Sequence, residues 1–144
     1  MKTNQKILLA VAVLIIAAIA IFAVWYFFPV TFLRDIEPSD VQSISIVDGT
    51  TGKSFVVEDR AEIEHIVENI QSVTMHKAGT TKGKKGWRFK MKFCDGNDSE
   101  LDSFIVEGES KISKDPYYYC SYRGKGRLCY EYLKELEKKY SRLQ

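Results

Sequence analysis

The side chains with the clearest capacity for specific contacts are basic and lie close together in the chain. A segment that contains no acidic residue holds Lys77, Lys82, Lys84, Lys85, Arg88, Lys90 and Lys92. Near an anionic membrane surface each such charge contributes about 1 kcal/mol of binding free energy. Anionic lipid headgroups or a cell-wall polymer would therefore be suitable ligands. The alternative is a solvated loop and strand face, because the acid-rich segment 95–109 could neutralise these charges across neighbouring strands.

Aromatic residues form a second concentration, in the last third of the chain. Tyr117, Tyr119 and Tyr122 are candidates for an aromatic binding face, because tyrosine presents a large contact area at a small entropic cost. The competing interpretation is that alternate tyrosines cover the sheet and pack against the last helix.

The three cysteines leave several alternatives open. Outside the cytoplasm a disulfide between Cys120 and Cys129 is permitted. Unpaired packing thiols are the alternative, and a thiol near a helix amino end could be reactive. Cys94 would have no partner in such a disulfide. The spacing of the cysteines does not match a structural zinc site.

No residue pattern identifies an enzyme. The only histidines, His65 and His76, have no cysteine or aspartate placed by sequence to form a nucleophile–base pair. The lysine-rich loop also lacks the spacing of a phosphate-binding P-loop. We expect no catalytic residue, no cofactor and no metal site. A hydrolase of envelope polymers is a further class, but the sequence lacks a paired-carboxylate or nucleophile signature for it.

These residues belong to a chain that begins with a long apolar stretch. Residues 7–28 are all apolar or aromatic. As a helix they would measure roughly 33 Å, enough to cross a bilayer core of about 30 Å. Pro29 disfavours helix in the residue before it, so the helix is predicted to end there. A cleaved signal peptide is the rival, but its apolar region is normally only about 7–15 residues long.

Charges beside this stretch predict its orientation. Lys2 and Lys6 precede it, whereas Arg34 follows it among acidic residues. This bias favours a cytoplasmic amino end. The expected organisation is a cytoplasmic tail at 1–6, a transmembrane helix at 7–28, a stalk at 29–39 and an extracytoplasmic domain at 40–144. After residue 30 nineteen basic residues balance nineteen acidic ones, so net charge gives no argument for a nucleic-acid partner.

Alternating apolar residues and turn residues predict the first half of the domain. Residues 41–58 are typical of a β-hairpin. Asp59 is expected to cap a helix that runs to about residue 71, with Glu62 completing a capping box. A short strand at 73–77 then leads into the lysine-rich loop at 78–86.

The strongest alternation lies in residues 87–93, where Trp87 opens the predicted strand. The next strand, at 100–107, should return antiparallel to it. Matching both faces predicts that Phe93 lies opposite Leu101, and the same register pairs Phe89 with Ile105 and Lys92 with Asp102.

The end of the chain is expected to hold one or two more strands and a helix. The strands are predicted at 109–113 and 117–122, and the helix from about residue 127 towards 141. This helix would lie across the sheet and cover apolar residues such as Phe104. The predicted fold is α+β, with an N-terminal transmembrane helix followed by an antiparallel sheet of about five to six strands and two helices packed on it.

Several of these segments carry a resemblance to a known group of proteins. Residues 44–53, the isoleucine-rich segment 62–70, the strand at 86–93 and the tyrosine-rich end resemble small membrane-anchored or secreted domains of Gram-positive bacteria. That group has no established activity. The resemblance therefore implies an extracytoplasmic α+β domain and carries over no functional residues.

Taken together, the sequence predicts a non-enzymatic protein with a single membrane span and an outer domain that binds a ligand at the cell envelope. The alternative is an accessory or inhibitor protein that docks on one membrane or secreted protein through its sheet. Neither interpretation includes nucleic acid as a partner.

Overall fold

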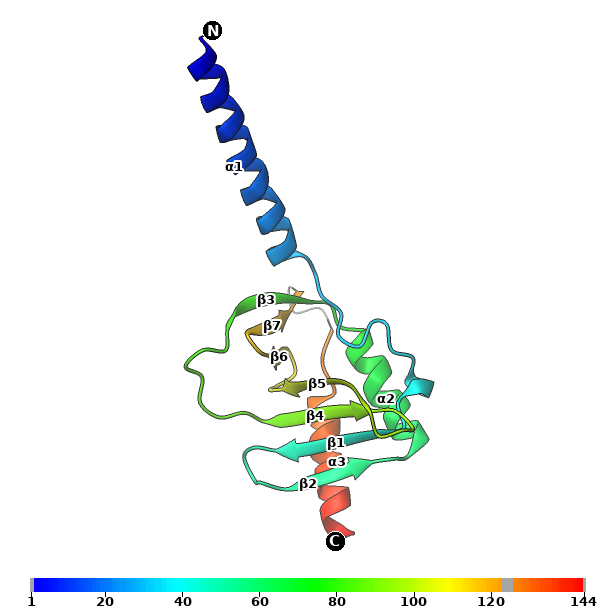
Figure 1. Ribbon diagram of the computed structural model, residues 1–144. Coiled ribbons are helices and arrows are strands. Elements are labelled where there is room, and N and C mark those ends of the chain that lie inside the picture. Colours follow the sequence, from blue (N-terminus) through cyan, green and yellow to red (C-terminus); the bar gives the residue numbers. More distant parts are fainter. Residues whose placement is uncertain (1, 123–125, 144) are drawn as a thin grey trace.

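The computed structural model of the protein describes residues 2–122 and 126–143. An N-terminal helix projects like a rod from one end of a folded α+β domain (Figure 1). In the described residues the domain contains a seven-stranded antiparallel sheet and two further α-helices. The predicted fold class is confirmed, with more strands than expected, because a two-residue turn separates two short strands near the tyrosines.

The sheet has the spatial order β2-β1-β4-β5-β6-β7-β3, and each neighbouring pair is antiparallel. Along the chain the elements are α1 (Thr3–Phe27), a 3₁₀ turn (Pro38–Asp40), β1 (Ser43–Asp48), β2 (Ser54–Val57), α2 (Arg60–Gln71), β3 (Met75–Thr80), β4 (Phe89–Cys94), β5 (Glu100–Val106), β6 (Lys111–Lys114), β7 (Tyr117–Ser121) and α3 (Tyr130–Arg142).

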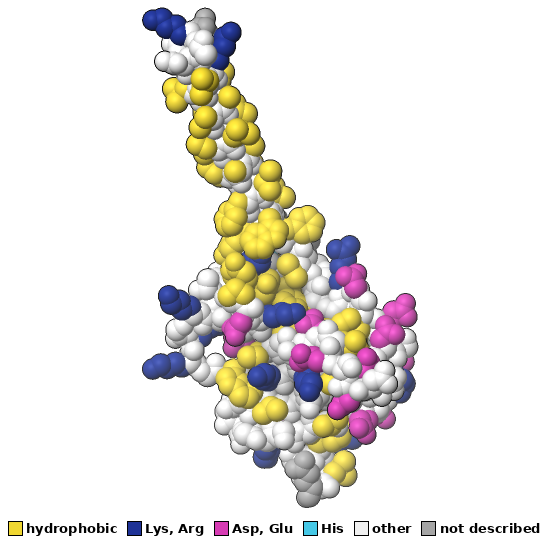
Figure 2. Space-filling view, in the orientation of Figure 1, with side chains coloured by type: hydrophobic (Ala, Val, Ile, Leu, Met, Phe, Trp, Pro, Cys, Tyr) yellow, Lys and Arg dark blue, Asp and Glu magenta, His cyan; other side chains and the backbone are white. Residues whose placement is uncertain are grey.

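Helix α1 is apolar on every side, and none of its described residues is buried. It is long and apolar enough to cross a membrane, a property that single anchors share with signal sequences. Figure 2 shows its hydrophobic side chains continuing onto the adjoining end of the domain.

One face of the sheet and both domain helices share a single hydrophobic core. Alternate residues of β1 and β4 point into this core, and α2 contributes the apolar face that its spacing predicts. The opposite face of the sheet, called the outer face below, carries exposed side chains that include Val56, Lys90 and Lys92.

The predicted register of β4 and β5 is wrong by one residue. Phe93 lies opposite Asp102 instead of Leu101, and Lys92 lies opposite Ser103. The register shifts between Phe93 and Cys94, where Leu101 is the extra residue of a β-bulge. Upstream of this bulge Phe89 pairs with Val106, so apolar residues face each other on the core side.

Trp87 lies outside β4, which begins only at Phe89. The indole packs against the β1–β2 turn. A Cβ atom on Gly49 would come within 2.5 Å of the Trp87 ring, so only glycine fits there. The strand is therefore shorter than its alternating pattern predicted.

The start of α2 confirms Asp59 as its cap, since the Glu62 N–H donates to the Asp59 carboxylate at 3.0 Å. The second half of the predicted capping box is not made. The Glu62 carboxylate accepts instead from the Tyr140 hydroxyl at 2.7 Å and pairs with Lys139. Glu62 thereby joins α2 to α3, which begins at Tyr130, later than predicted.

Residues 29–39, predicted as a stalk, pack against the domain. The Val30 and Met75 backbones exchange hydrogen bonds of 2.7 and 2.8 Å. Phe32 and Leu33 are only 5% and 3% exposed. The Gln71 side-chain amide donates to the Leu33 carbonyl, fixing this segment to the end of α2. No long flexible link therefore separates α1 from the sheet.

The sheet opens between β5 and β6, and Phe32 fills the opening on the core side. Among the described residues only two pairs join these strands, Ile105 with Ser113 and Val106 with Ile112. The Phe32 ring lies 5.0 Å from the rings of both Phe104 and Tyr119. Phe104 is thus covered by Phe32, where the sequence predicted the last helix.

Replacing Phe32 by alanine should lower the free energy of unfolding by about 3–5 kcal/mol, because it leaves a cavity at the opening of the sheet. Urea denaturation of the full chain in detergent measures this change. The matched control is Val56→Ala, whose side chain is 46% exposed on the outer face and should change stability by no more than about 0.5 kcal/mol. Equal effects of the two substitutions would contradict the packing described for residues 29–39.

Candidate functional site

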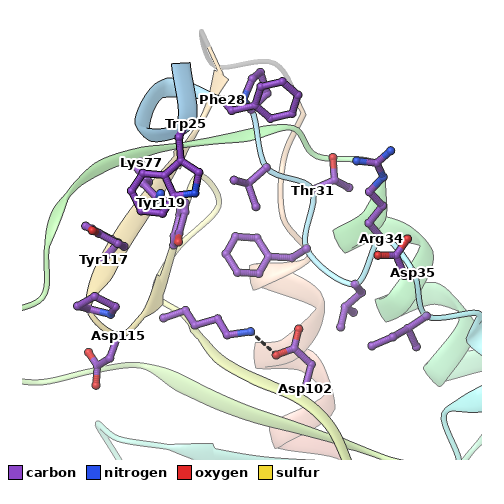
Figure 3. Close-up of a pocket in the computed structure, with 17 residues that line it drawn as sticks. Trp25, Phe28, Thr31, Arg34, Asp35, Lys77, Asp102, Asp115, Tyr117 and Tyr119 are labelled. Atoms are coloured by element: carbon purple, nitrogen blue, oxygen red, sulfur yellow. Dashed lines mark hydrogen bonds and ion pairs between the residues drawn. The ribbon is translucent and has the colours of Figure 1, made fainter. Parts of the chain in front are cut away.

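A pocket of about 660 Å³ lies where the end of α1 meets the sheet (Figure 3). Helix α1, the segment after it and the opened part of the sheet all contribute to its wall. The lining residues are Trp25, Phe28, Pro29, Val30, Thr31, Phe32, Leu33, Arg34, Asp35, Ile36, Lys77, Asp102, Lys114, Asp115, Pro116, Tyr117 and Tyr119. We call this the junction pocket.

Strand pairing explains how the sheet contributes to the junction pocket. Tyr117 and Tyr119 alternate along β7 and therefore point to the same face. Lys77 of β3 lies opposite Tyr119, which brings its side chain to that face as well. Burial raises the pKa of the Tyr119 phenol, whose hydroxyl is a hydrogen-bond donor in this wall.

The Lys77 ammonium is held among aromatic rings from two parts of the chain. Its Nζ atom lies 3.8 Å from the ring centroid of Trp25, 5.4 Å from that of Tyr26 and 4.7 Å from that of Tyr117. Cation–π attraction therefore links α1 to the sheet through one charge. Among the described residues no carboxylate forms an ion pair with Lys77.

The three aspartates of the pocket differ in their partners: one forms an ion pair, one accepts a hydrogen bond and one does neither with the described residues. Lys114 pairs with Asp102 across the opening of the sheet. The Asp115 carboxylate accepts a 2.5 Å hydrogen bond from the Thr81 hydroxyl. Arg34 and Asp35 at the rim are exposed, and neither makes a hydrogen bond or ion pair with any described residue. Two cations of the pocket, Lys77 and Arg34, are thus without a carboxylate partner in the described chain.

The other six residues of the predicted basic run do not form one surface with Lys77. Lys84 binds Glu107 at 3.2 Å and lies over the Tyr118 ring, and Arg88 pairs with Asp48 at 3.3 Å. The remaining four are exposed: Lys82, Lys85, Lys90 and Lys92. These lysines occupy a loop and the outer face, so Lys77 is the one member of the basic run in the junction pocket.

The aromatic candidates are also separated. Tyr117 and Tyr119 line the junction pocket, whereas Tyr122 is 43% exposed and lies edge-on to His76 at 5.7 Å. Sequence reasoning missed Asp102 and Lys114, because their approach depends on the opening between two strands. The aromatic end of α1 could have indicated this pocket from the sequence, because Pro29 ends the helix directly after it and the chain then enters the domain.

All three cysteines lie within the described residues and are free thiols, so the Cys120–Cys129 disulfide is not formed. Cys120 lies on the outer side of β7, opposite His76, whereas Cys129 belongs to the hydrophobic core. Burial raises the pKa of the Cys129 thiol to about 12. A reactive thiolate at the start of α3 is therefore contradicted.

A buried acid pair lies away from the junction pocket and joins α3 to the β1–β2 turn. Asp48 and Glu137 are 0% and 8% exposed. Burial and the neighbouring Asp48 carboxyl raise the pKa of Glu137. Burial alone would raise the pKa of Asp48, but hydrogen bonds from Glu137 and the Thr50 N–H, with the Arg88 charge, lower it overall. The pKa values of these two neighbouring carboxyl groups are therefore shifted apart, upward at Glu137 and downward at Asp48.

The hydrogen bonds of this acid pair hold the β1–β2 turn against α3. The Thr51 hydroxyl donates to Glu137 at 3.2 Å, and the Thr50 N–H donates to Asp48 at 2.8 Å. Neither acid lines the junction pocket. In the part of the chain that the structure describes, no three histidine, cysteine, aspartate or glutamate side chains are grouped so that they could hold a metal ion.

Comparison of the chain with protein-family models, with curated proteins and with solved structures gives no match. The function is therefore argued from the geometry of the junction pocket and from the position of α1.

Replacing Glu137 by glutamine should raise the free energy of unfolding at pH 7 by about 1 kcal/mol, because the amide is a permanent donor to Asp48 and keeps the acceptor for Thr51. The pKa of Glu137 is raised in the folded state, so the native protein loses stability as the pH rises above the unfolded value. The advantage of the variant should therefore shrink as the pH falls towards 4.

Urea midpoints between pH 4 and pH 8 measure this effect in detergent. Glu135→Gln is the matched control, because Glu135 is exposed on the same helix and makes no ion pair with the described residues. A Glu137→Gln variant that is less stable than the native chain at pH 7 would contradict the raised pKa of Glu137.

Proposed function

We propose that the chain is a single-pass membrane protein whose α+β domain binds a ligand at the outer surface of the bilayer, in the junction pocket. The observation that carries this proposal is the shared wall of the pocket. Trp25 and Phe28 at the end of the apolar helix line the same cavity as Lys77 and Tyr117 of the sheet.

The depth of the pocket follows from the apolar length of α1. The uninterrupted apolar run ends at residue 28. Aromatic side chains such as Trp25 and Tyr26 favour the interface between hydrocarbon and water. If α1 spans the bilayer, the junction pocket lies at the level of the lipid headgroups. A ligand there would be a component of the membrane surface or of the adjoining envelope.

The charge distribution supports an extracytoplasmic domain. Lys2 and Lys6 stand before the span, and Arg34 beyond it is followed by Asp35 and Glu37. Basic residues near the ends of a span favour the cytoplasmic side. The resemblance to envelope domains of Gram-positive bacteria leads to the same proposal.

The lining of the pocket supports binding in preference to catalysis. It contains no serine, cysteine or histidine among the described lining residues. The described wall therefore lacks the serine–histidine and cysteine–histidine pairs that activate a nucleophile in many hydrolases. Its lysines, arginine, aspartates and aromatic rings are side chains that hold a polar or charged ligand in place. We therefore propose a role that requires neither a cofactor nor a metal ion.

A second candidate function uses the outer face of the sheet. No described helix covers that face, and Val56, Lys90 and Lys92 are exposed on it. An accessory or inhibitor protein would dock on its partner there. The two functions require contacts on different faces of the sheet, so one experiment separates them.

A photo-crosslinking residue placed at Tyr117 of the full chain should capture a ligand in intact membranes, because this side chain lines the junction pocket. The matched control is the same residue at Val56 on the outer face, which should give no specific adduct. Mass spectrometry of the adducts gives the result. Capture at Val56 without capture at Tyr117 would overturn the proposal and support the docking function.

A further inference from the structure

We propose that the junction pocket binds the phosphate group of a membrane phospholipid, with Lys77 and Arg34 as its cationic contacts. This inference rests on the proposed function and names the chemical class of its ligand. It is argued from the charge of Lys77, the position of Arg34, the occupied acids and the apolar side of the pocket.

Lys77 carries a charge that the described chain does not neutralise. Its ammonium is half-buried among the rings of Trp25, Tyr26 and Tyr117. Aromatic rings attract a cation but carry no net charge, so they leave the Lys77 ammonium without an anionic partner. An anion in the junction pocket would supply the missing partner. At headgroup depth the abundant anion of this kind is a lipid phosphate.

Arg34 is directed to the rim of the same pocket by an unusual turn. The preceding Leu33 has a φ of 62°, a left-handed conformation that leucine rarely adopts. Burial of the Leu33 side chain and the hydrogen bond from Gln71 to its carbonyl maintain this turn. Figure 3 shows Arg34 beside Asp35, on the other side of the pocket from Lys77 and Trp25. A free guanidinium suits a phosphate, because its N–H groups can bind two oxygens at once.

In the described chain none of the three aspartates of the pocket forms an ion pair with Lys77 or Arg34. Asp102 is paired with Lys114, and Asp115 accepts from Thr81. Asp35 makes no ion pair with Arg34 or any other described residue. The carboxylates of Asp35 and Asp115 remain able to accept hydrogen bonds from the amine or hydroxyl groups that a headgroup carries beyond its phosphate.

The side of the pocket nearest the bilayer is apolar. Phe28 and Trp25 are 60% and 58% exposed there, and Pro29 follows them in the wall. These side chains would contact the glycerol and the first acyl carbons of a lipid whose phosphate reaches Lys77. Polar contacts on the sheet side and apolar contacts on the helix side match the two parts of one phospholipid.

Trp25 provides a direct reporter of binding, because the chain has two tryptophans and Trp87 lies at the β1–β2 turn. In a full-length Trp87→Phe background in neutral detergent, short-chain phosphatidylglycerol should change the Trp25 fluorescence in a saturable way. The matching diacylglycerol, which lacks the phosphate, should not. Inorganic phosphate should bind at least ten-fold more weakly than the lipid.

Arg34→Gln is the cleanest variant, since Arg34 makes no hydrogen bond or ion pair with the described residues. It should weaken phosphatidylglycerol binding at least five-fold, and Arg34→Lys should restore part of the affinity. Lys77→Gln should weaken binding as well. Lys92→Gln on the outer face is the charge-matched control and should leave the titration unchanged.

An Arg34→Gln variant that binds phosphatidylglycerol as tightly as the parent would overturn this assignment, as would equal binding of the diacylglycerol. Equal affinity for inorganic phosphate would show a free-anion site and would also reject the lipid. Crosslinking at Tyr117 without a saturable lipid titration leaves the proposed function standing while the lipid assignment fails. Failure of both measurements rejects both.

Discussion

The position of the Lys77 ammonium among the rings of Trp25, Tyr26 and Tyr117 connects the apolar helix to the sheet. It acts together with the backbone pairing of Val30 and Met75, so the helix and the segment that follows it both contact the edge strand β3. Cation–π contacts strengthen where water is partly excluded, as it is at a half-buried lysine. If α1 crosses a bilayer, this link holds the sheet at the membrane surface, and the direction of the domain follows from that of the helix.

The opening of the sheet between β5 and β6 adds a wall to the junction pocket beside this link. The opened strands carry Asp102 and Lys114, which pair with each other and line the same pocket as Lys77. Phe32 fills the core side, so the opening does not expose the hydrophobic core. The Ser103 N–H donates to the Asp102 carboxylate at 2.8 Å, which satisfies an edge group that a neighbouring strand would otherwise pair. The same residues that close the opening therefore build one wall of the junction pocket.

Local patterns in the sequence were sufficient to predict most of the helices and strands. The apolar run of α1, the Asp59 cap of α2 and the alternation in β4 each follow from neighbouring residues, and together they give the α+β class. The β4–β5 register failed because a bulge after Phe93 inserts one residue that alternation cannot reveal. The pocket was beyond local reasoning for a similar reason. Lys77 looked like one basic residue among seven, and only the pairing of β3 with β7 separates it from the others.

The most direct test of the link measures the distance between α1 and the sheet by double electron–electron resonance in lipid nanodiscs. Spin labels at Asn4 and Lys92, both exposed, report on the two bodies without touching the junction pocket. The account predicts one narrow distance distribution for the full chain and a broad one after Lys77→Met. A broad distribution in the parent chain, or a narrow one that Lys77→Met leaves unchanged, would contradict it.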